Sequence, residues 1–179
     1  MKKYFAKETY LLNRILFFFL ITFLLLLQSA KSQNGNWVWI NGDSTPNASA
    51  FLGIKGTYGV NNVPEAHYEG CFWKDLQGDL WIYGGQISGG PDGLSDLWKY
   101  SFTLNQWMWV KGPGGVLNQN PVYGIKGIPS PLNTPGSRIW TAATWTDNQN
   151  NLWLCGGYNN GDKNDMWRYN ISTNEWDIV

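Results

Sequence analysis

Short runs of aromatic and β-branched residues alternate with stretches rich in glycine, asparagine and aspartate along most of this 179-residue chain. The runs predict β-strands, because such side chains fit a pleated and half-buried surface, and the stretches between them predict turns. Eight strands are expected, at 68–74, 80–83, 96–100, 106–110, 139–146, 152–155, 165–169 and 175–179. The 12 tryptophans and 21 glycines agree with this interpretation. The pattern therefore predicts an all-β protein and disfavours a helical bundle.

The last four expected strands repeat the first four at a spacing of about 70 residues. Leu80–Gly85 (LWIYGG) recurs as Leu152–Gly157 (LWLCGG), and Asp96–Tyr100 (DLWKY) recurs as Asp165–Tyr169 (DMWRY). The fourth strand has a third and earlier copy at 36–41 (NWVWIN). This many matches in the same order indicate an internal duplication.

In each repeat a strand ends in Gly-Gly, a variable loop follows, and then come Asp-Leu-Trp-Lys-Tyr or its equivalent, a turn and a tryptophan. This order resembles the kelch repeat and is similar to the repeats of the galactose oxidase central domain, over residues 37–179. The resemblance implies a kelch-type β-propeller with two four-stranded blades, at 66–110 and 137–179, and one leading strand at 36–41. It also implies structural roles, in tight turns and in packing between blades, for Gly84, Gly85, Trp98, Tyr100, Trp107, Gly156, Gly157, Trp167, Tyr169 and Trp176.

The repeat is longer than the ~50 residues typical of kelch proteins. The extra residues form two inserts, 42–66 and 112–137, which are rich in glycine, proline and asparagine and each contain Gly-Ile-Lys-Gly. Connections of this length are interpreted either as a decorated rim or as functional loops.

Propellers close with about 4–8 blades, so two blades and one strand make an incomplete ring. An open arc would leave sheet faces and strands exposed. The leading hypothesis is a truncated product of a longer propeller protein, and assembly of several copies into one ring is the alternative.

The first 32 residues have the pattern of a secretory signal peptide. Four basic residues lie within 1–14, an apolar run spans 15–27, and small residues precede an expected cleavage site before Gln33. An uncleaved anchor is the alternative, but the run is shorter than the ~20 residues that a spanning helix needs. We therefore expect a secreted protein with no membrane attachment after cleavage.

Removing this leader changes the charge. The whole chain has 13 basic and 13 acidic residues, and residues 33–179 keep eight and twelve of them, a net charge of −4. A mildly acidic domain with two arginines, Arg138 and Arg168, lacks the basic footprint of a nucleic-acid binder. The two arginines also lie at unrelated positions, unlike the arginine cluster with which sialidases bind a carboxylate.

The sequence offers little catalytic chemistry. His67 is the only histidine, so a histidine-based metal site is not expected, and no cofactor is predicted. The resemblance to galactose oxidase does not extend to its copper–radical site, which needs two histidines, two tyrosines and a cysteine cross-linked to a tyrosine. No residue is given a catalytic role.

Pairs of carboxylates are the remaining candidates for hydrolytic chemistry. Glu65 with Glu69, and Asp75 with Asp79, are close enough in sequence to be considered. Asp75 recurs as Asp147 in the same turn after a first strand, where aspartate is a good turn former. We interpret these carboxylates as structural.

Four aspartates precede the third strands: Asp92, Asp96, Asp162 and Asp165. Asp96 and Asp165 recur at the same position, which predicts a repeated role in binding backbone. A Ca²⁺ site at Asp162 and Asp165 does not match the spaced-ligand loop pattern.

Cys71 and Cys155 are the only cysteines, and a secreted protein permits a disulfide. They occupy different positions in their repeats, which favours two free thiols. Asn47 and Asn170 each begin a glycosylation sequon, which has meaning only in a eukaryotic secretory host.

The predicted function is non-catalytic binding of an unknown protein or glycan. The alternative is a fragment of a galactose oxidase-like or other glycan-active propeller enzyme whose catalytic residues lie outside this chain. The expected binding loops are 42–66, 86–95, 112–137 and 158–164. Four tryptophans that the motif does not explain either pack between blades or stack on a ligand: Trp73, Trp109, Trp140 and Trp145.

Overall fold

A computed structural model describes residues 35–179, with the exception of 88, 91 and 141. The chain divides into two compact units, 1–39 and 40–179, and the strands all belong to the second. The predicted leader, 1–32, lies outside the described residues. Over 35–179, apart from those three positions, no helix is long and apolar enough to cross a membrane.

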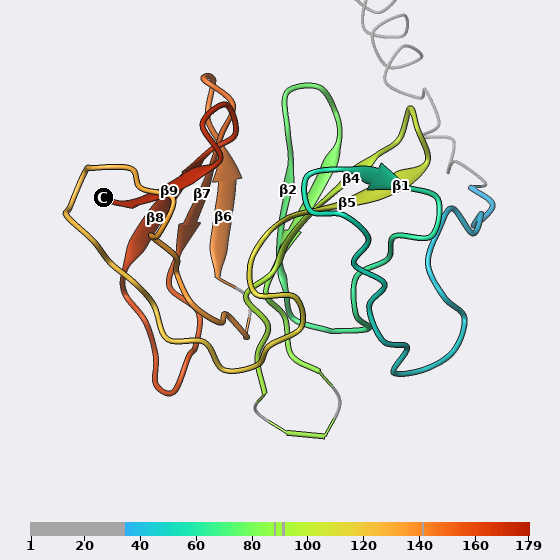
Figure 1. The fold of residues 1–179 in the computed structure, drawn as a ribbon, viewed down its shortest axis with the longest axis horizontal. Coiled ribbons are helices and arrows are strands. Elements are labelled where there is room, and N and C mark those ends of the chain that lie inside the picture. The colour runs from blue at the N-terminus through green and yellow to red at the C-terminus, as the bar shows by residue number, and fades with distance from the viewer. Residues whose placement is uncertain (1–34, 88, 91, 141) are drawn as a thin grey trace, which may run out of the picture. The chain divides into compact units, whose positions relative to one another are not determined.

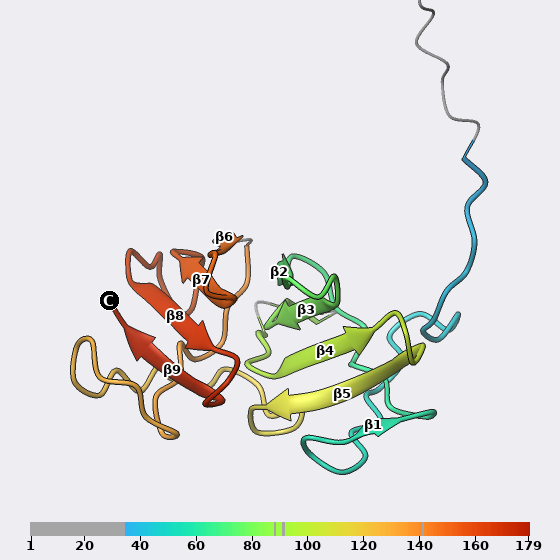
Figure 2. The ribbon, with the colours of Figure 1, turned by 90° about the horizontal axis from the view of Figure 1, so that it is seen from above.

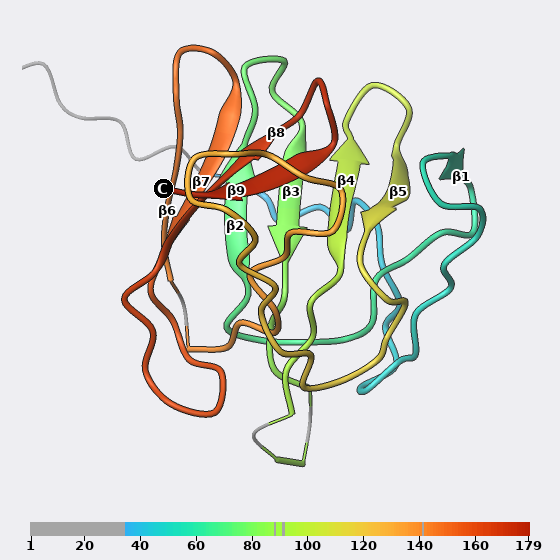
Figure 3. The same ribbon diagram turned by 60° about the vertical axis from the view of Figure 1, so that its left-hand side comes forward.

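Two antiparallel sheets make up the second unit and confirm the all-β prediction (Figure 1). The first sheet has the order β1-β5-β4-β3-β2, which Figure 3 shows from right to left. Its strands are β1 (Tyr58–Gly59), β2 (Cys71–Lys74), β3 (Leu80–Tyr83), β4 (Leu97–Ser101) and β5 (Gln106–Lys111). The second sheet has the order β6-β7-β8-β9, with β6 (Ala143–Thr146), β7 (Asn151–Cys155), β8 (Met166–Asn170) and β9 (Glu175–Ile178). We call 42–111 and 112–179 the first and second repeat.

The first strand of each repeat is shorter than the sequence predicts. Tyr68 and Ile139, where these strands were expected to begin, each make only an isolated bridge to a loop. The next residues, Glu69 and Trp140, have left-handed backbone conformations, with φ of 55° and 57°. A left-handed residue breaks the extended backbone, so the continuous ladder starts only at Cys71 and at the corresponding position of the second repeat.

The prediction of a leading strand at 36–41 is wrong. These residues form no strand, and Trp37 is fully exposed. The sequence pattern matches that of β5, but β5 has β4 beside it, and the sequence before residue 36 contains no counterpart of β4. A strand needs a neighbour to bind its backbone groups, which the local pattern cannot supply. The strand that the prediction missed is β1, which pairs with β5.

The two inserts cover the outer edges of the sheets. In the first repeat the amide of Gly56 donates to the carbonyl of Trp109 at 2.8 Å, and in the second the amide of Gly127 donates to the carbonyl of Ile178 at 2.7 Å. Each insert is also closed on itself by one bridge, Phe51 to Val63 and Val122 to Thr134. Covering an edge strand in this way blocks pairing with other chains.

One buried asparagine fixes each insert to its sheet. The side-chain amide of Asn62 donates to the carbonyls of Thr57 and Trp107, and that of Asn133 donates to the carbonyls of Ile128 and Trp176, at 3.0–3.2 Å. The first glycine of each Gly-Ile-Lys-Gly motif lies against this side chain: a Cβ on Gly124 would be 2.2 Å from Asn133 Oδ1. The first glycine of the Gly-Ile-Lys-Gly motif is therefore needed because the backbone there packs closely against the buried asparagine.

The core lies between the two sheets, where tryptophans and tyrosines of β3 meet those of β8 and β9. The rings of Trp81 and Tyr169 are 5.8 Å apart, and those of Tyr83 and Trp176 are 5.4 Å apart. Figure 2 shows β2 and β6 side by side. Between these two strands the hydroxyl of Thr144 donates to the carbonyl of Phe72 at 2.8 Å.

The turn after each first strand is built around one aspartate, Asp75 or Asp147. Each carboxylate accepts hydrogen bonds from the backbone amides two and four residues later and from the indole six residues later, at 2.8–3.0 Å. Asp75 also pairs with Lys99, at 3.1 Å, and Asp79 pairs with the same lysine at 3.0 Å. The structure thus places Asp75 and Asp147 as turn formers.

These bonds predict a loss of stability in acid. Burial raises the pKa of Asp147, but hydrogen bonds from Asn151, Trp153 and the backbone outweigh it and lower this pKa to about 2. A carboxyl with a lower pKa in the folded state stabilises the protein above its unfolded value of about 4, and this contribution is lost as the pH falls toward 2. We expect Asp147→Asn to be less stable than wild type in urea at pH 5–7 and nearly equal near pH 2.

The matched control is Asp162→Asn, because Asp162 is an exposed carboxylate of the same repeat. Its stability should follow the wild-type value at every pH. A penalty for Asp147→Asn that is unchanged at pH 2 would show that the charge of this carboxylate does not stabilise the turn.

Candidate functional site

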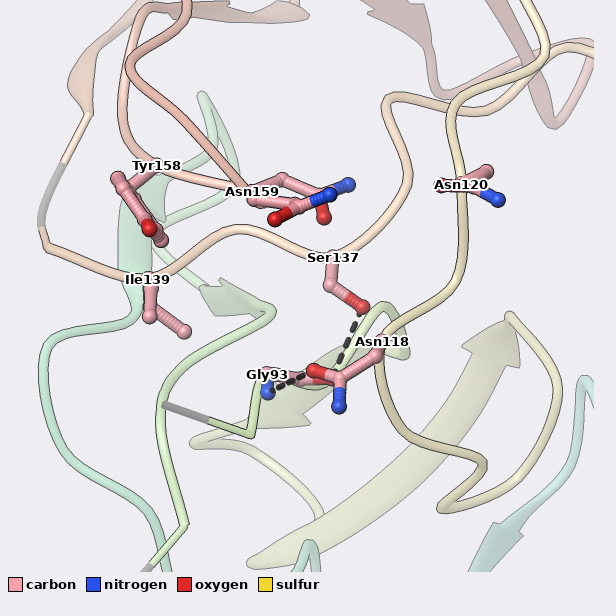
Figure 4. Close-up of a pocket in the computed structure, with 8 residues that line it drawn as sticks. Gly93, Asn118, Asn120, Ser137, Ile139, Tyr158 and Asn159 are labelled. Atoms are coloured by element: carbon pink, nitrogen blue, oxygen red, sulfur yellow. Dashed lines mark hydrogen bonds between the residues drawn. The ribbon is translucent and has the colours of Figure 1, made fainter. Parts of the chain in front are cut away.

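Three of the four loops expected to bind a ligand surround one pocket of about 250 Å³ (Figure 4). Loop 86–95 contributes Gly93, insert 112–137 contributes three residues, and loop 158–164 contributes three more. The fourth loop, 42–66, does not line it. The lining residues are Gly93, Asn118, Asn120, Ser137, Ile139, Tyr158, Asn159 and Asn160.

Hydrogen bonds between the loops fix one wall of the pocket. The amide of Gly93 donates to Asn118 Oδ1 at 2.9 Å, and the hydroxyl of Ser137 donates to the carbonyl of Gly93 at 2.8 Å, as Figure 4 shows. The side chain of Asn159 donates to the carbonyl of Gln119 at 3.0 Å. These side chains are already committed to protein partners, so the wall is formed before any ligand binds.

Two further amides are available to a ligand. Asn120 and Asn160 are exposed, and among the described residues their side chains make no hydrogen bond. Each amide offers two donors and one acceptor oxygen. Asn120 also lines a second hollow of about 440 Å³, together with Lys55 and Lys111, so a ligand longer than the pocket has room to continue.

One lining residue, Tyr158, belongs to an aromatic pair. The rings of Trp140 and Tyr158 are 4.2 Å apart, and Trp140 remains 51% exposed. Trp140 has a φ of 57°, a conformation that is costly for a bulky side chain and that persists where the surroundings impose it. The strained backbone holds this ring at the surface, packed on the lining residue Tyr158.

The first repeat lacks this pair. At the positions of Trp140 and Tyr158 it has Glu69 and Gln86, although Glu69 has the same left-handed backbone, with a φ of 55°. The backbone is therefore common to both repeats, and the aromatic side chains are specific to the second. The sequence marked Trp140 as unexplained, and it placed Tyr158 and the four asparagines in expected binding loops without singling any of them out. The difference between the repeats could have revealed Tyr158.

Both arginines of the described residues are paired with aspartates. Arg138, adjacent in sequence to two lining residues, is fully buried and pairs with Asp165 at 2.6 Å. Arg168 pairs with Asp177 at 3.0 Å, elsewhere on the second sheet. The lining residues themselves carry no charge, so the site is polar and neutral.

The other candidates from the sequence lie outside this pocket. His67 makes a contact of 2.6 Å between its Nδ1 and the carbonyl of Glu65, and it borders a narrow crevice with Asp96. Within the described part of the chain, no group of three or more His, Cys, Asp and Glu side chains could hold a metal ion. Cys71 and Cys155 are both free, as predicted. Burial raises the pKa of the Cys71 thiol to about 11, so this thiol is unreactive at neutral pH.

No model of a known protein family matches this chain, and no curated protein matches it either.

Proposed function

We propose that this protein is a secreted, kelch-type β-propeller module that binds a neutral glycan without catalysing its conversion. The observation that carries the proposal is the uncharged pocket together with the half-exposed ring of Trp140, which packs on the lining residue Tyr158. Localisation rests on the leader pattern of the first 32 residues.

The propeller interpretation is supported by the arrangement of the repeats. In each repeat four antiparallel strands follow one another in chain order, β2 to β5 and β6 to β9, and β2 and β6 are neighbours. In a propeller the strands at the central channel come from successive blades in the same way. The kelch resemblance of the sequence adds the Gly-Gly turns, in which Gly84, Gly85, Gly156 and Gly157 all have positive φ.

A neutral sugar fits the chemistry of the pocket. Sugar rings present apolar C–H faces, which pack on an aromatic ring such as that of Trp140, and hydroxyl edges, which exchange hydrogen bonds with amides. Asn120 and Asn160 supply such amides. A sulfated or sialylated sugar would need a cationic partner, and no cationic side chain among the described residues lines the pocket. Arg138 is bound to Asp165. Lys55 and Lys111 of the second hollow already donate to backbone carbonyls.

The alternative of an enzyme fragment rests on the sequence resemblance alone. The carboxylates of Glu65, Glu69, Asp75 and Asp79 do not line the pocket. We therefore assign the pocket a binding role.

Replacing Trp140 by alanine tests this proposal. We expect the wild-type chain to bind neutral oligosaccharides on a glycan array, and the variant to bind the best of them about tenfold more weakly by calorimetry, because a stacking contact of about 1.4 kcal/mol is lost. Asn160→Ala should weaken the same glycan through the loss of a hydrogen bond.

Trp37→Ala provides the matched control, since Trp37 is fully exposed and lies outside the pocket. Its affinity should equal that of wild type. The proposal is contradicted if no glycan binds, if charged glycans bind best, or if Trp140→Ala retains full affinity.

A further inference from the structure

The two sheets are repeats of one another, and they pack together through faces that are not equivalent. On the first sheet the contact uses the face that carries Trp81 and Tyr83, which we call the front face. On the second sheet it uses the face that carries Tyr169 and Trp176, which we call the back face. One face of each kind is therefore left over: the front face of the second sheet and the back face of the first.

We propose that the chain associates head to tail with a second copy of itself, whose first sheet places its back face on the front face of this second sheet. The two open faces are the repeat equivalents of the two faces already joined within the chain. On the front face of the second sheet, Trp145 and Trp153 are the equivalents of Trp73 and Trp81. On the back face of the first sheet, Tyr100 is the equivalent of Tyr169. The intramolecular contact is thus a template for the intermolecular one, and the proposal does not depend on the glycan pocket.

Both faces carry exposed aromatic surface, although Ile82, Trp98 and Tyr100 at the centre of the back face of the first sheet are already buried within the chain. Trp145 is 41% exposed on the front face of the second sheet, and Phe72 is 49% exposed on the back face of the first. Trp73, the equivalent of Trp145, is buried and donates its indole N–H to the carbonyl of Trp153 at 2.7 Å. The ring of Trp145 stacks on Trp153, and no hydrogen bond of its indole N–H is recorded in the described part of the chain. A carbonyl of a second copy would complete the same contact.

A buried carboxylate oxygen marks a second point of the contact. In the first repeat Asp96 accepts hydrogen bonds from the amides of Gly114 and Gly115, both at 2.7 Å, which belong to the insert of the following repeat. Asp165 holds the equivalent position, and its side chain is only 8% exposed. Its Oδ1 atom is buried and has no hydrogen-bond partner among the described residues. The Nε atom of Arg138, in the same ion pair, is likewise buried without a hydrogen-bond partner among the described residues. In the first repeat a following insert supplies the donors at this position, and a second copy would supply them here.

The first insert already has the shape of a following insert. Asn118 binds Gly93 of the preceding repeat and has a φ of 55°, and Asn47 at the equivalent position has a φ of 58°. The amide of Ala66 donates to the carbonyl of Ala48 at 2.9 Å, as the amide of Ser137 does to that of Gln119. The first insert therefore already has the conformation in which it could bind the second repeat of another copy.

A head-to-tail contact is heterologous, so it generates a ring if the rotation closes. With two sheets in each chain, two to four copies give the roughly 4–8 sheets of a closed propeller. Self-assembly would thus bury the faces that a single chain leaves open.

Light scattering and sedimentation of the purified chain over a concentration series test this proposal. We expect wild type to associate, and Trp145→Lys and Phe72→Lys each to stay monomeric, because each variant blocks one of the two open faces. Mixing these two variants should produce a 1:1 dimer and nothing larger, because the mixture retains one intact front face and one intact back face.

Ile125→Lys is the matched control. Ile54, its equivalent in the first repeat, remains 75% exposed although the second sheet packs on the first, so a lysine at 125 should leave association unchanged. Phe102→Lys is a second back-face variant, since Phe102 contacts Tyr100, in case Phe72→Lys folds poorly. A monomer at every concentration, or an oligomer that persists in both Trp145→Lys and Phe102→Lys, overturns the proposal.

Discussion

Replacing Gly84 by alanine is expected to destabilise the protein by more than about 3 kcal/mol. Gly84 has a φ of 69°, where an alanine is strained. Its new Cβ would also lie 2.5 Å from the carbonyl oxygen of Arg138 and 3.2 Å from that of Leu94. Both atoms belong to backbone, which cannot rotate away as a side chain can.

The position explains why this clash cannot be relieved locally. Gly84 follows β3, and its neighbour Gly85 donates its amide to the carbonyl of Arg138 at 2.8 Å. Arg138 in turn donates its own amide to the carbonyl of Leu94 at 3.2 Å. Moving Arg138 would break the hydrogen bonds through which the second repeat is joined to the first, so we expect the two sheets to lose contact together.

Urea unfolding of Gly84→Ala and Gly156→Ala provides the measurement and its control. Gly156 is the repeat equivalent of Gly84 and has a φ of 80°, but its Cβ would lie 3.3 Å from the nearest atom, the carbonyl oxygen of Lys163. Conformational strain of about 1–2 kcal/mol is the main effect there, because a shift of a few tenths of an ångström relieves the contact with Lys163. Equal losses in the two variants would contradict the role of the Arg138 carbonyl and leave backbone strain as the whole effect.

The sequence predicted the repeated elements well because each of them is locally encoded. The aromatic runs marked β3 and β7, and the Gly-Gly pairs marked positions that do have positive φ. The leading strand failed for the opposite reason, since strand formation depends on a neighbour that no local pattern specifies. β1 was missed because it is two residues long and is held in place by Asn62, whose partners lie up to 45 residues away.

The candidate site could be predicted only in part. Insert 112–137 was nominated from its length and composition, and loops 86–95 and 158–164 as the variable loops after the Gly-Gly pairs, and all three line the pocket. Which side chains form its wall depends on contacts such as that of Asn118 with Gly93, 25 residues earlier. The aromatic pair is visible in the sequence only when Trp140 is compared with its equivalent, a glutamate.

Removing the carboxylate of Asp165 is expected to destabilise the protein by about 3–5 kcal/mol, because it leaves the guanidinium of Arg138 buried and unpaired. The Arg138 side chain is fully buried, and its Nη2 atom is 2.6 Å from Asp165 Oδ2. Its other recorded side-chain bond is donated to the carbonyl of Ser137, at 3.2 Å. A single carbonyl cannot replace a carboxylate, so Asp165→Ala should be among the most damaging substitutions outside the apolar core.

The double variant separates the cost of an unpaired charge from the worth of the pair. We expect Arg138→Met combined with Asp165→Ala to be more stable than Asp165→Ala alone, because methionine removes the buried charge that alanine leaves behind. Asp177→Ala is the control: its partner Arg168 keeps a side chain that is 33% exposed, so water solvates the freed guanidinium and the cost of the unpaired charge is small. Unfolding in urea at low protein concentration measures the stability of wild type, Asp165→Ala, the double variant and Asp177→Ala. A double variant less stable than Asp165→Ala would show that Arg138 stabilises the fold through its packing and not through its charge.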